Sequence, residues 1–409
     1  MNKKSFSITD DSDRLCVGVV TTSFPVVKSS SSGIFVERLV AHIAECAEVT
    51  VLVPCPDRDI DQPQEKPYRI EFFSYGIKKW QRLAHYPGGI PDAIRRRDPA
   101  LLLLPIFIPA MFLACLRLAG KVDIIHGNWS VPGLIAAIAA RMRGCPAITT
   151  VRGTDVNRAE RSLLFRLFLK STLMLNRYIV VVSEEMRDSL CGRFPLWADR
   201  IVFIPNGVSV EGAGSRPPFR SPMRLLTVGS LIRPKRIETL LSALSQIQHI
   251  VNVSLRIVGE GPERDNLEEI ANRLSIREYV EFAGSVPPEE VERHLQWADI
   301  FVFASESEGR PNVILEAMAA RLPVVATDIP GVRELLGADA GLLFSVGDAP
   351  ALVRCIRTLI SDPDGSHDMG RMAARRIKDN DLTWDTAARR YIALYKDAIE
   401  HAGGRPCAD

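Results

Sequence analysis

The chain has 409 residues, a net charge of +2, 46% hydrophobic residues and 24% charged residues, which suits two globular domains with separate cores and gives no bulk electrostatic reason to expect nucleic-acid binding. Its eight cysteines form no C-x2-C pair and are expected to be reduced thiols of a cytosolic protein, not a disulfide or zinc framework. The first residues contain no apolar stretch, so no signal peptide is predicted.

The first predicted elements open a Rossmann-like domain. An apolar strand is predicted over 15–22, an amphipathic helix begins just after Gly33, and a second strand follows over 48–54. In such a unit the loop before the helix lies at the ligand-binding edge of the parallel sheet. We therefore expect Gly33 to face a ligand, although a loop glycine can also serve only the turn.

The segment from 80 to 120 combines basic and apolar residues. Arg95, Arg96 and Arg97 precede a long apolar run that Pro105 and Pro109 interrupt. The run is too short and too broken for a comfortable membrane-spanning helix. A buried helix is the first interpretation, and a helix lying in a membrane interface is the alternative. The basic and apolar helix predicted over 159–176 leaves the same two possibilities.

Polar residues follow two further predicted strands. His126 and Asn128 end the first of them, and Arg152 and Asp155 follow the second. The carboxyl ends of parallel strands meet at one edge of a sheet, so we expect these residues to face the same crevice. A single histidine after a strand is often only a hydrogen-bonded loop residue. Arginine stays protonated at working pH, so Arg152 is expected to bind a ligand and not to abstract a proton.

A change of composition divides the chain. Residues 211–222 are rich in Gly, Pro and Ser and almost without apolar residues, which predicts a linker. The linker separates a first domain over 1–210 from a second domain over 223–383. A predicted strand, loop and helix open the second domain over 223–244.

The loop of this opening unit is basic. It contains Arg233, Lys235 and Arg236, and cations at this place can neutralise a leaving diphosphate. A solvated basic turn is the alternative, which suits Arg236 better than Lys235. The next strand ends at Gly259, where the missing side chain allows the backbone to approach a ligand.

The most informative stretch is 305–335, which is predicted to contain a helix between two strands. Glu308 lies before the helix and Glu316 about one turn inside it. The first N–H groups of a helix lack partners and bind anions, and carboxylates accept hydrogen bonds from sugar hydroxyls. Taken alone, Glu308 would be a capping acid and Glu316 a solvated helix residue; the surrounding pattern favours a sugar nucleotide. The backbone expected to hold its diphosphate belongs to Arg310, Pro311, Asn312 and Val313.

These residues carry a resemblance to a known family. The sequence E-G-R-P-N-V-I-L-E-A-M-A, followed by P-V-V-A-T-D-I-P-G, resembles the C-terminal signature of the retaining family 4 (group 1) glycosyltransferases, including bacterial polysaccharide enzymes of the teichuronic-acid type. The resemblance implies an α/β protein of the GT-B fold, with two Rossmann-like, doubly wound domains facing across a cleft. It also implies that a final helix, about 384–402, crosses back to the first domain.

The resemblance also suggests roles for the charged residues. Glu308 would contact the transferred sugar, Glu316 the ribose hydroxyls and Lys235 the diphosphate. The family typically has a histidine, in H-G-x-D, where this chain has Arg152, which leaves open whether His126 or Arg152 contacts the sugar.

The same resemblance extends to the loops. Gly33 would face the diphosphate and the acceptor, and the turn at Ser285 and Val286 would hold the nucleobase. The family's G-R-L-x-x-x-K-G pattern is kept here at Gly229 and Lys235, but Ser230 replaces its arginine and Arg236 its last glycine. Arg233 or Arg236 would replace the missing charge.

The expected activity is the transfer of a sugar from a nucleoside diphosphate to an acceptor hydroxyl, with retention of configuration and no bound metal or other cofactor. We expect a lipid-linked or saccharide acceptor in cell-envelope or exopolysaccharide synthesis, and a cytoplasmic protein that rests on the anionic inner face of the membrane. The alternatives are a sugar-nucleotide epimerase of the same architecture, which would act without an acceptor, and a catalytically silent sugar-nucleotide binder.

Overall fold

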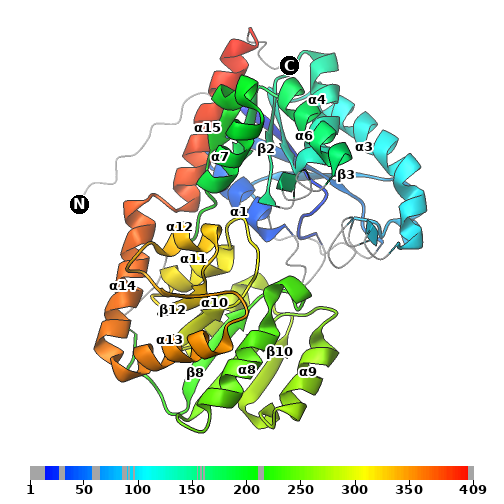
Figure 1. Ribbon diagram of the computed structural model, residues 1–409. Helices are drawn as coiled ribbons and strands as arrows, with labels where there is room; N and C mark the ends of the chain where they lie inside the picture. The colour runs from blue at the N-terminus through cyan, green and yellow to red at the C-terminus, as the bar shows by residue number, and fades with distance from the viewer. Residues whose placement is uncertain are drawn as a thin grey trace.

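The computed structural model describes residues 14–26, 33–57, 65–84, 90, 93–94, 97–153, 155–156, 159, 162–210 and 216–403. These residues form two α/β domains, each built on a parallel sheet, and Figure 1 shows one domain above the other. The predicted fold class, two Rossmann-like domains, is confirmed. Of the predicted features, Arg95, Arg96 and the first half of the linker, 211–215, lie outside the described residues.

The first domain contains a seven-stranded sheet in the order β3-β2-β1-β4-β5-β6-β7. All neighbouring strands are parallel. Their short, β-branched sequences suit strands covered on both faces. The strand order reverses between β1 and β4, which is where ligands bind in open parallel sheets. The strands are β1 Cys16–Val20, β2 Glu48–Pro54, β3 Arg69–Phe73, β4 Ile124–Asn128, β5 Ala147–Thr150, β6 Tyr178–Val181 and β7 Ile201–Phe203.

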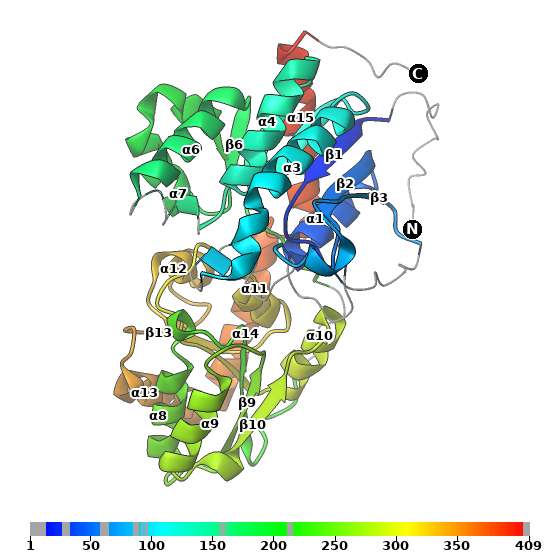
Figure 2. The same ribbon diagram turned by 90° about the vertical axis from the view of Figure 1, so that its right-hand side faces the viewer.

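Helices cover both faces of this sheet. Residues of α1 and α15 share one hydrophobic core with the strands, whereas residues of α3 and α4 share another. Helix α4 packs between α3 and α6, as Figure 2 allows the reader to follow. The helices are α1 Ile34–Ile43, α3 Leu104–Leu118, α4 Ser130–Arg143, α6 Leu163–Leu175, α7 Glu184–Arg193 and α15 Trp384–His401, with short 3₁₀ helices η2 Lys78–Trp80, η3 Pro99–Leu103 and η4 Pro195–Arg200.

The second domain contains a six-stranded parallel sheet in the order β10-β9-β8-β11-β12-β13. Its strands are β8 Met223–Val228, β9 Val253–Val258, β10 Val280–Gly284, β11 Ile300–Phe303, β12 Val324–Thr327 and β13 Leu342–Phe344. Its helices are α8 Ile237–Ile247, α9 Arg264–Arg273, α10 Pro288–Trp297, α11 Asn312–Ala319, α12 Pro330–Leu336, α13 Ala349–Ser361 and α14 Pro363–Asp379, with η5 Arg233–Lys235 and η6 Arg277–Tyr279. Pro330 begins α12, because proline suits the first turn of a helix.

The last helix, α15, returns to the first domain. Figure 1 shows α14 and α15 running one after the other along the same side of the molecule. Trp384, Tyr391 and Tyr395 of α15 are buried in the core of the first domain. The chain passes between the domains twice at one place, where a Cβ atom on Gly207 would lie 2.1 Å from the backbone nitrogen of Trp384. Only glycine fits such a close approach.

Helix α3 differs from its first interpretation as a buried helix. Only one stripe of α3 is buried, namely Phe107, Met111, Cys115 and Leu118. Among the described residues, one helical stretch, Pro99–Leu118, is long and apolar enough to cross a membrane by length and composition, and 28% of its apolar window is buried. The opposite stripe, which includes Leu102 and Leu113, is exposed.

Candidate functional site

The amino end of α11 lies against the first domain. Strand β11 leads into a loop that ends at Pro311, the N-cap of α11. The side-chain amide of Asn206, from the loop after β7, donates a 2.9 Å hydrogen bond to Oδ1 of Asn312 in the first turn of α11. The free N–H groups of this first turn therefore lie at the boundary between the domains, where they can bind an anion.

Glu308 and Lys235 form an ion pair just before α11. Lys235 comes from η5, the short helix after β8, and its ammonium lies 5.4 Å from the centre of the Phe303 ring. The hydroxyl of Ser305 donates a 3.1 Å hydrogen bond to the same carboxylate oxygen of Glu308. Both charged side chains are about one fifth exposed, so a ligand can reach them. The structure thus brings two of the predicted site residues together.

Glu316 forms an ion pair with the first domain. Its carboxylate lies 2.5 Å from Nη1 of Arg38, on α1. Arg38 was not among the predicted site residues, because its sequence position on an amphipathic helix gives no sign of a partner 278 residues away. A ribose bound to Glu316 would meet this guanidinium as well.

Arg152 lies on the first-domain side of the same boundary and is 8% exposed. Its guanidinium packs 3.9 Å above the ring centre of Phe35, from the start of α1. Nη1 donates a weak 3.4 Å hydrogen bond to Asn206, whereas Nε and Nη2 have no hydrogen-bond partner among the described residues. Burial lowers the pKa of Arg152 to about 10, so the side chain remains charged at neutral pH.

Asn128 adds a second buried polar group at the end of β4. It is fully buried, and neither its amide nitrogen nor its amide oxygen has a hydrogen-bond partner within the described part of the chain. Buried polar groups in folded proteins are nearly always satisfied by protein, water or ligand. Asn206, like Arg38, was absent from the predicted site residues. The only available signal was its position shortly after a strand, in I-P-N-G.

His126 lies behind this site, in the core. Its Nδ1 is 2.7 Å from the hydroxyl of Tyr395 and its Nε2 is 2.8 Å from the hydroxyl of Thr150. Burial, with a further contribution from the charge of Arg152, lowers the pKa of His126 to about 3. The ring is therefore neutral, and both nitrogens are occupied. We correct its assignment: His126 links β4 and β5 to α15, and does not present a nitrogen to a ligand.

The other predicted cations point elsewhere. Arg233 is 89% exposed at its side chain and pairs with Glu263, and Arg236 pairs with Glu306 on the rim. The side chain of Arg310 is buried and pairs with Glu334 of α12. Of the basic residues in and beside η5, Lys235 is therefore the one that contacts Glu308.

The predicted loop glycines permit close backbone contacts. Gly33 is the N-cap of α1 with φ +75°, and a Cβ atom there would lie 2.1 Å from the carbonyl oxygen of Ser23. Gly259 approaches Gly229 so closely that a Cβ atom would lie 1.9 Å from its carbonyl oxygen. Gly229 and Gly259 thus allow the loops after β8 and β9 to lie close together, beside Lys235 of η5. Ser285 and Val286 follow β10, where Ser285 is exposed and Val286 half-buried.

Two family models match this chain. The model of group 1 glycosyl transferases matches residues 217–376, and the model of glycosyltransferase family 4 matches residues 32–211. The chain belongs to the family 4, group 1 glycosyltransferases. The two matched ranges extend through both domains and contain Arg38, Arg152, Lys235, Glu308 and Glu316.

Relatives of this glycosyltransferase include the putative teichuronic acid biosynthesis glycosyltransferase TuaC of Bacillus subtilis (strain 168). The two are 27% identical over 353 residues, which is 82% of this chain and 87% of the relative. The GDP-mannose-dependent alpha-(1-6)-phosphatidylinositol monomannoside mannosyltransferase of Mycolicibacterium smegmatis is 25% identical over 399 residues, 92% of this chain and 97% of that one.

Solved structures support the fold of the glycosyltransferase. Sucrose-phosphate synthase from Thermosynechococcus elongatus superposes with a TM-score of 0.77 at 22% identity, covering 95% of this chain and 100% of the other. Anabaena HepE in complex with UDP superposes with a TM-score of 0.71 at 17% identity, covering 94% and 100%.

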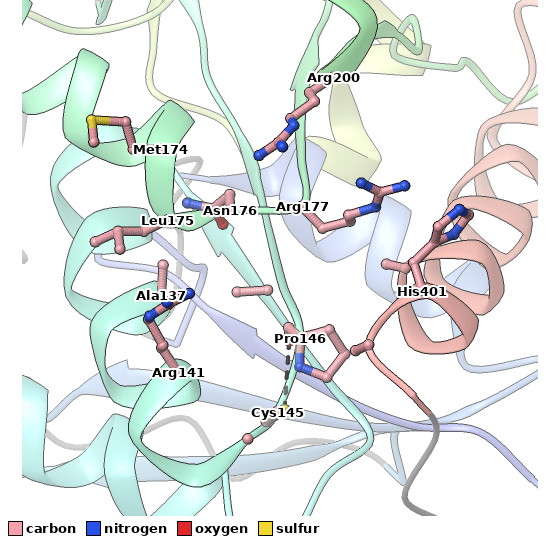
Figure 3. Close-up of a pocket in the computed structure, with 14 residues that line it drawn as sticks. Ala137, Arg141, Cys145, Pro146, Met174, Leu175, Asn176, Arg177, Arg200 and His401 are labelled. Atoms are coloured by element: carbon pink, nitrogen blue, oxygen red, sulfur yellow. Dashed lines mark hydrogen bonds between the residues drawn. The ribbon is translucent and has the colours of Figure 1, made fainter. Parts of the chain in front are cut away.

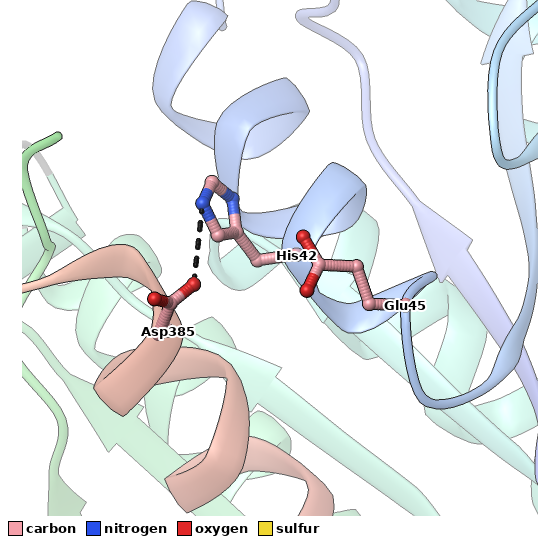
Figure 4. Close-up of side chains that lie close together, drawn as sticks. All are labelled: His42, Glu45 and Asp385. Carbon is pink, nitrogen blue, oxygen red and sulfur yellow. Dashed lines mark ion pairs between the residues drawn. The ribbon is translucent and has the colours of Figure 1, made fainter. Parts of the chain in front are cut away.

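Within the described residues, one group of side chains in the glycosyltransferase has the spacing of metal ligands. His42, Glu45 and Asp385 place one ligand atom each within 4.8 Å of one another, where α1 meets α15 (Figure 4). His42 already contacts Asp385 at 3.5 Å and the carbonyl of Arg38 at 2.8 Å. Glu45 and Asp385 are exposed, and exposed acidic residues alone do not make a metal site. That the reaction needs no metal stays a prediction.

A cavity of about 480 Å³ lies at the other edge of the first sheet. Figure 3 shows Arg141, Arg177, Arg200 and His401 around it. It is bounded by the carboxyl end of α4 and the starts of β5 and β6, which is the edge away from Arg152 and α11. None of the predicted site residues lines this cavity.

Proposed function

We propose that this glycosyltransferase moves a hexosyl group from a nucleoside-diphosphate sugar to an acceptor hydroxyl, with retention of configuration, in cell-envelope or exopolysaccharide synthesis. The observation that carries the proposal is the Glu308–Lys235 pair beside the amino end of α11, next to the first-domain loop that contains Arg152. Gly153 and Gly309 approach so closely that a Cβ atom on Gly153 would lie 3.2 Å from the Cα atom of Gly309, so the two sides belong to one site.

Each residue has a distinct task in the proposed reaction. The N–H groups of α11 and the ammonium of Lys235 would stabilise the diphosphate as negative charge develops on it. Glu316 would accept hydrogen bonds from the ribose, and Glu308 from the transferred sugar. We propose a same-face displacement in which the leaving phosphate helps to deprotonate the acceptor, so that the protein contributes charge stabilisation and positioning.

Calorimetric titration with UDP, GDP and ADP tests the binding half of this proposal. Glu316→Ala and Lys235→Ala should each weaken binding of the preferred diphosphate by about tenfold to a hundredfold, as expected for loss of a charge-assisted hydrogen bond. Glu308→Ala should leave that affinity nearly unchanged, because Glu308 is assigned to the sugar. Equal losses in all three variants would contradict the separate roles.

Proton NMR of an early product tests the reaction itself. A panel of sugar nucleotides with saccharide and lipid-linked acceptors should give a product with the anomeric configuration of the donor. An inverted product would overturn retention. Turnover of the donor to a new sugar nucleotide without acceptor would instead indicate an epimerase, and binding without any turnover would indicate a silent binder.

An exposed apolar surface supports a membrane-associated acceptor. The outward residues of α3, α4 and α6, together with η3 just before α3, include Leu102 of η3, which is 81% exposed, and Leu163 of α6, which is 68% exposed. These three helices contain five Arg or Lys residues and no Asp or Glu. Apolar side chains among cations and without acids are complementary to an anionic bilayer. The α3–α4–α6 surface would then hold the enzyme at the inner face of the membrane, near a lipid-linked acceptor.

Co-sedimentation with vesicles tests this surface. The protein should bind phosphatidylglycerol vesicles at low salt and less at high salt, because polybasic attraction is screened. Leu102→Asp and Leu167→Asp should reduce binding about fivefold or more, from roughly 1 kcal/mol per charge at the surface. Met372→Asp, at an exposed methionine on α14 of the second domain, is the matched control. Wild-type protein that stays in the supernatant at low salt would exclude the membrane and favour a soluble acceptor.

A further inference from the structure

The guanidinium of Arg152 is a buried charge without a neutralising partner in contact. Nε and Nη2 have no hydrogen-bond partner among the described residues. The nearby carboxylate of Asp155 is occupied otherwise: it accepts hydrogen bonds from the backbone N–H and hydroxyl of Ser130, at 3.0 and 2.6 Å, and from the backbone N–H of Arg152, at 2.9 Å. A buried charge without a contacting counter-charge is strongly unfavourable, so the folded protein leaves a place for one.

The surroundings of Arg152 limit where that counter-charge can come from. Phe35 covers one face of the guanidinium at 3.9 Å, and Trp129 lies 5.8 Å from it. Its other polar neighbours include Tyr391 of α15 and Asn206, which connects to Asn312 at the amino end of α11. The unsatisfied amide of Asn128 ends β4, the strand that pairs with β5, and Arg152 follows β5. The unpaired nitrogens thus belong to the boundary between the domains, beside the place proposed for the diphosphate.

We propose that Arg152, with Asn128, binds an anionic oxygen group, a carboxylate or a phosphate, on one of the two substrates. This inference rests on the proposed function and narrows its substrate class. Arginine presents parallel N–H donors that match a carboxylate or phosphate, and the Asn128 amide can donate a further hydrogen bond. The group is carried either by the transferred sugar, which is then a hexuronic acid, or by the acceptor, which is then phosphorylated.

Two pairs of ligands, each matched except for the charge, separate these sources. In the first arm, the full-length protein is titrated with the glucuronic acid and glucose derivatives of whichever diphosphate it binds. In the second arm, the diphosphate complex is titrated with glucose 1-phosphate and methyl glucoside. The wild-type protein should prefer the anion about tenfold or more in one arm, as expected for a charge-assisted pair.

Arg152→Leu should abolish that preference and leave the affinity for the plain diphosphate unchanged. Arg152→His, which restores the residue typical of the family, should bind the neutral ligand at least as well as the anion. Arg152→Leu should also unfold at the same temperature or higher, because it removes an unneutralised buried charge. Arg310→Leu is the matched control: it removes a buried guanidinium that does have a partner, Glu334, and should lower the unfolding temperature.

No preference for the anion in either arm, or a preference that survives in Arg152→Leu, would overturn the inference. If the proposed function is wrong, the plain diphosphates should not bind, which is a separate result from the two arms above. In that case the second arm, run on the protein without diphosphate, still decides the role of Arg152.

Discussion

The polar side chains at the boundary between the two domains differ: those of the second domain have ion-pair partners, whereas two of the first domain are buried with unsatisfied atoms. In the second domain, the charged residues around α11 have partners of their own: Lys235 with Glu308, and Arg310 with Glu334. In the first domain, Arg152 and Asn128 are buried with unsatisfied nitrogen and oxygen atoms. The charges around α11 are therefore neutralised within the protein, whereas the guanidinium of Arg152 has no carboxylate in contact among the described residues.

This difference separates two parts of substrate recognition. The groups that would bind a diphosphate and a ribose, which every nucleotide sugar has, are already in ion pairs: Lys235 with Glu308 inside the second domain, and Glu316 with Arg38 across the boundary. In the proposed reaction, the unsatisfied groups of the first domain would face the part of the substrates that varies. Specificity for the sugar or the acceptor is therefore expected to change with residues such as Arg152, and not with Lys235 or Glu316.

The largest expected effect is on catalysis, at Glu308 of the second domain. Glu308→Gln should lower kcat about 10² to 10³-fold, the usual consequence of removing one preorganised group around developing charge. Steady-state kinetics with saturating donor measures it. Glu306→Gln, two residues away and paired with Arg236 on the rim, is the control and should retain nearly full kcat. Similar losses in both variants would mean that the loop, and not the Glu308 carboxylate, is what matters.

A smaller effect is expected on stability, at the buried His126 of the first domain. The pKa of His126 is about 3 in the folded protein, below its ordinary value of 6.5, so the unfolded chain binds a proton between these values and the folded chain does not. Its contribution to stability is therefore complete above pH 6.5 and is lost as the pH falls towards 3. Wild-type protein should lose more unfolding free energy over this window than His126→Phe, as measured by urea denaturation. Parallel curves would contradict a buried neutral imidazole.

The smallest effect is expected at the ion pair between Arg38 of the first domain and Glu316 of the second. The Arg38–Glu316 pair is partly exposed, with side chains 29% and 19% accessible, and such pairs contribute about 1 kcal/mol or less. Arg38→Gln should tighten binding of the diphosphate less than about fivefold, because the ribose no longer competes with a guanidinium for Glu316. Calorimetry against Arg117→Gln, an exposed arginine on α3, measures the change. Weaker binding would show that Arg38 itself contacts the ligand.

The second domain's part of the candidate site could be located from the sequence, because that part is local. Glu308 and Glu316 lie in one continuous strand–loop–helix unit, whose periodicity places Glu308 before α11 and Glu316 about one turn inside it. Lys235 needed only one further unit of the same kind. The helix predicted between the two strands of this unit is α11, Asn312–Ala319.

The first domain's part could not be predicted in the same way, because distant residues decide it. His126 follows a strand in sequence, yet α15 covers it with Tyr395, 269 residues later. Arg38 meets Glu316 only when the two domains are in contact. The directions of the side chains could not be predicted either. Nothing in the sequence indicates that Arg233 pairs with Glu263 whereas Lys235 pairs with Glu308. Helix α3 was misjudged because apolar composition does not tell burial from exposure.

The return of α15 to the first domain has a consequence for biosynthesis. Domains usually fold one after another, the amino-terminal one first, as the chain leaves the ribosome. Here the first domain cannot complete its core until residues 384–401 have been made, because Trp384, Tyr391 and Tyr395 belong to it. The sheet translated first waits for the helix translated last. During that interval the second domain is already whole, and the nascent first domain exposes the apolar face that α15 will cover, which makes it a natural client for chaperones.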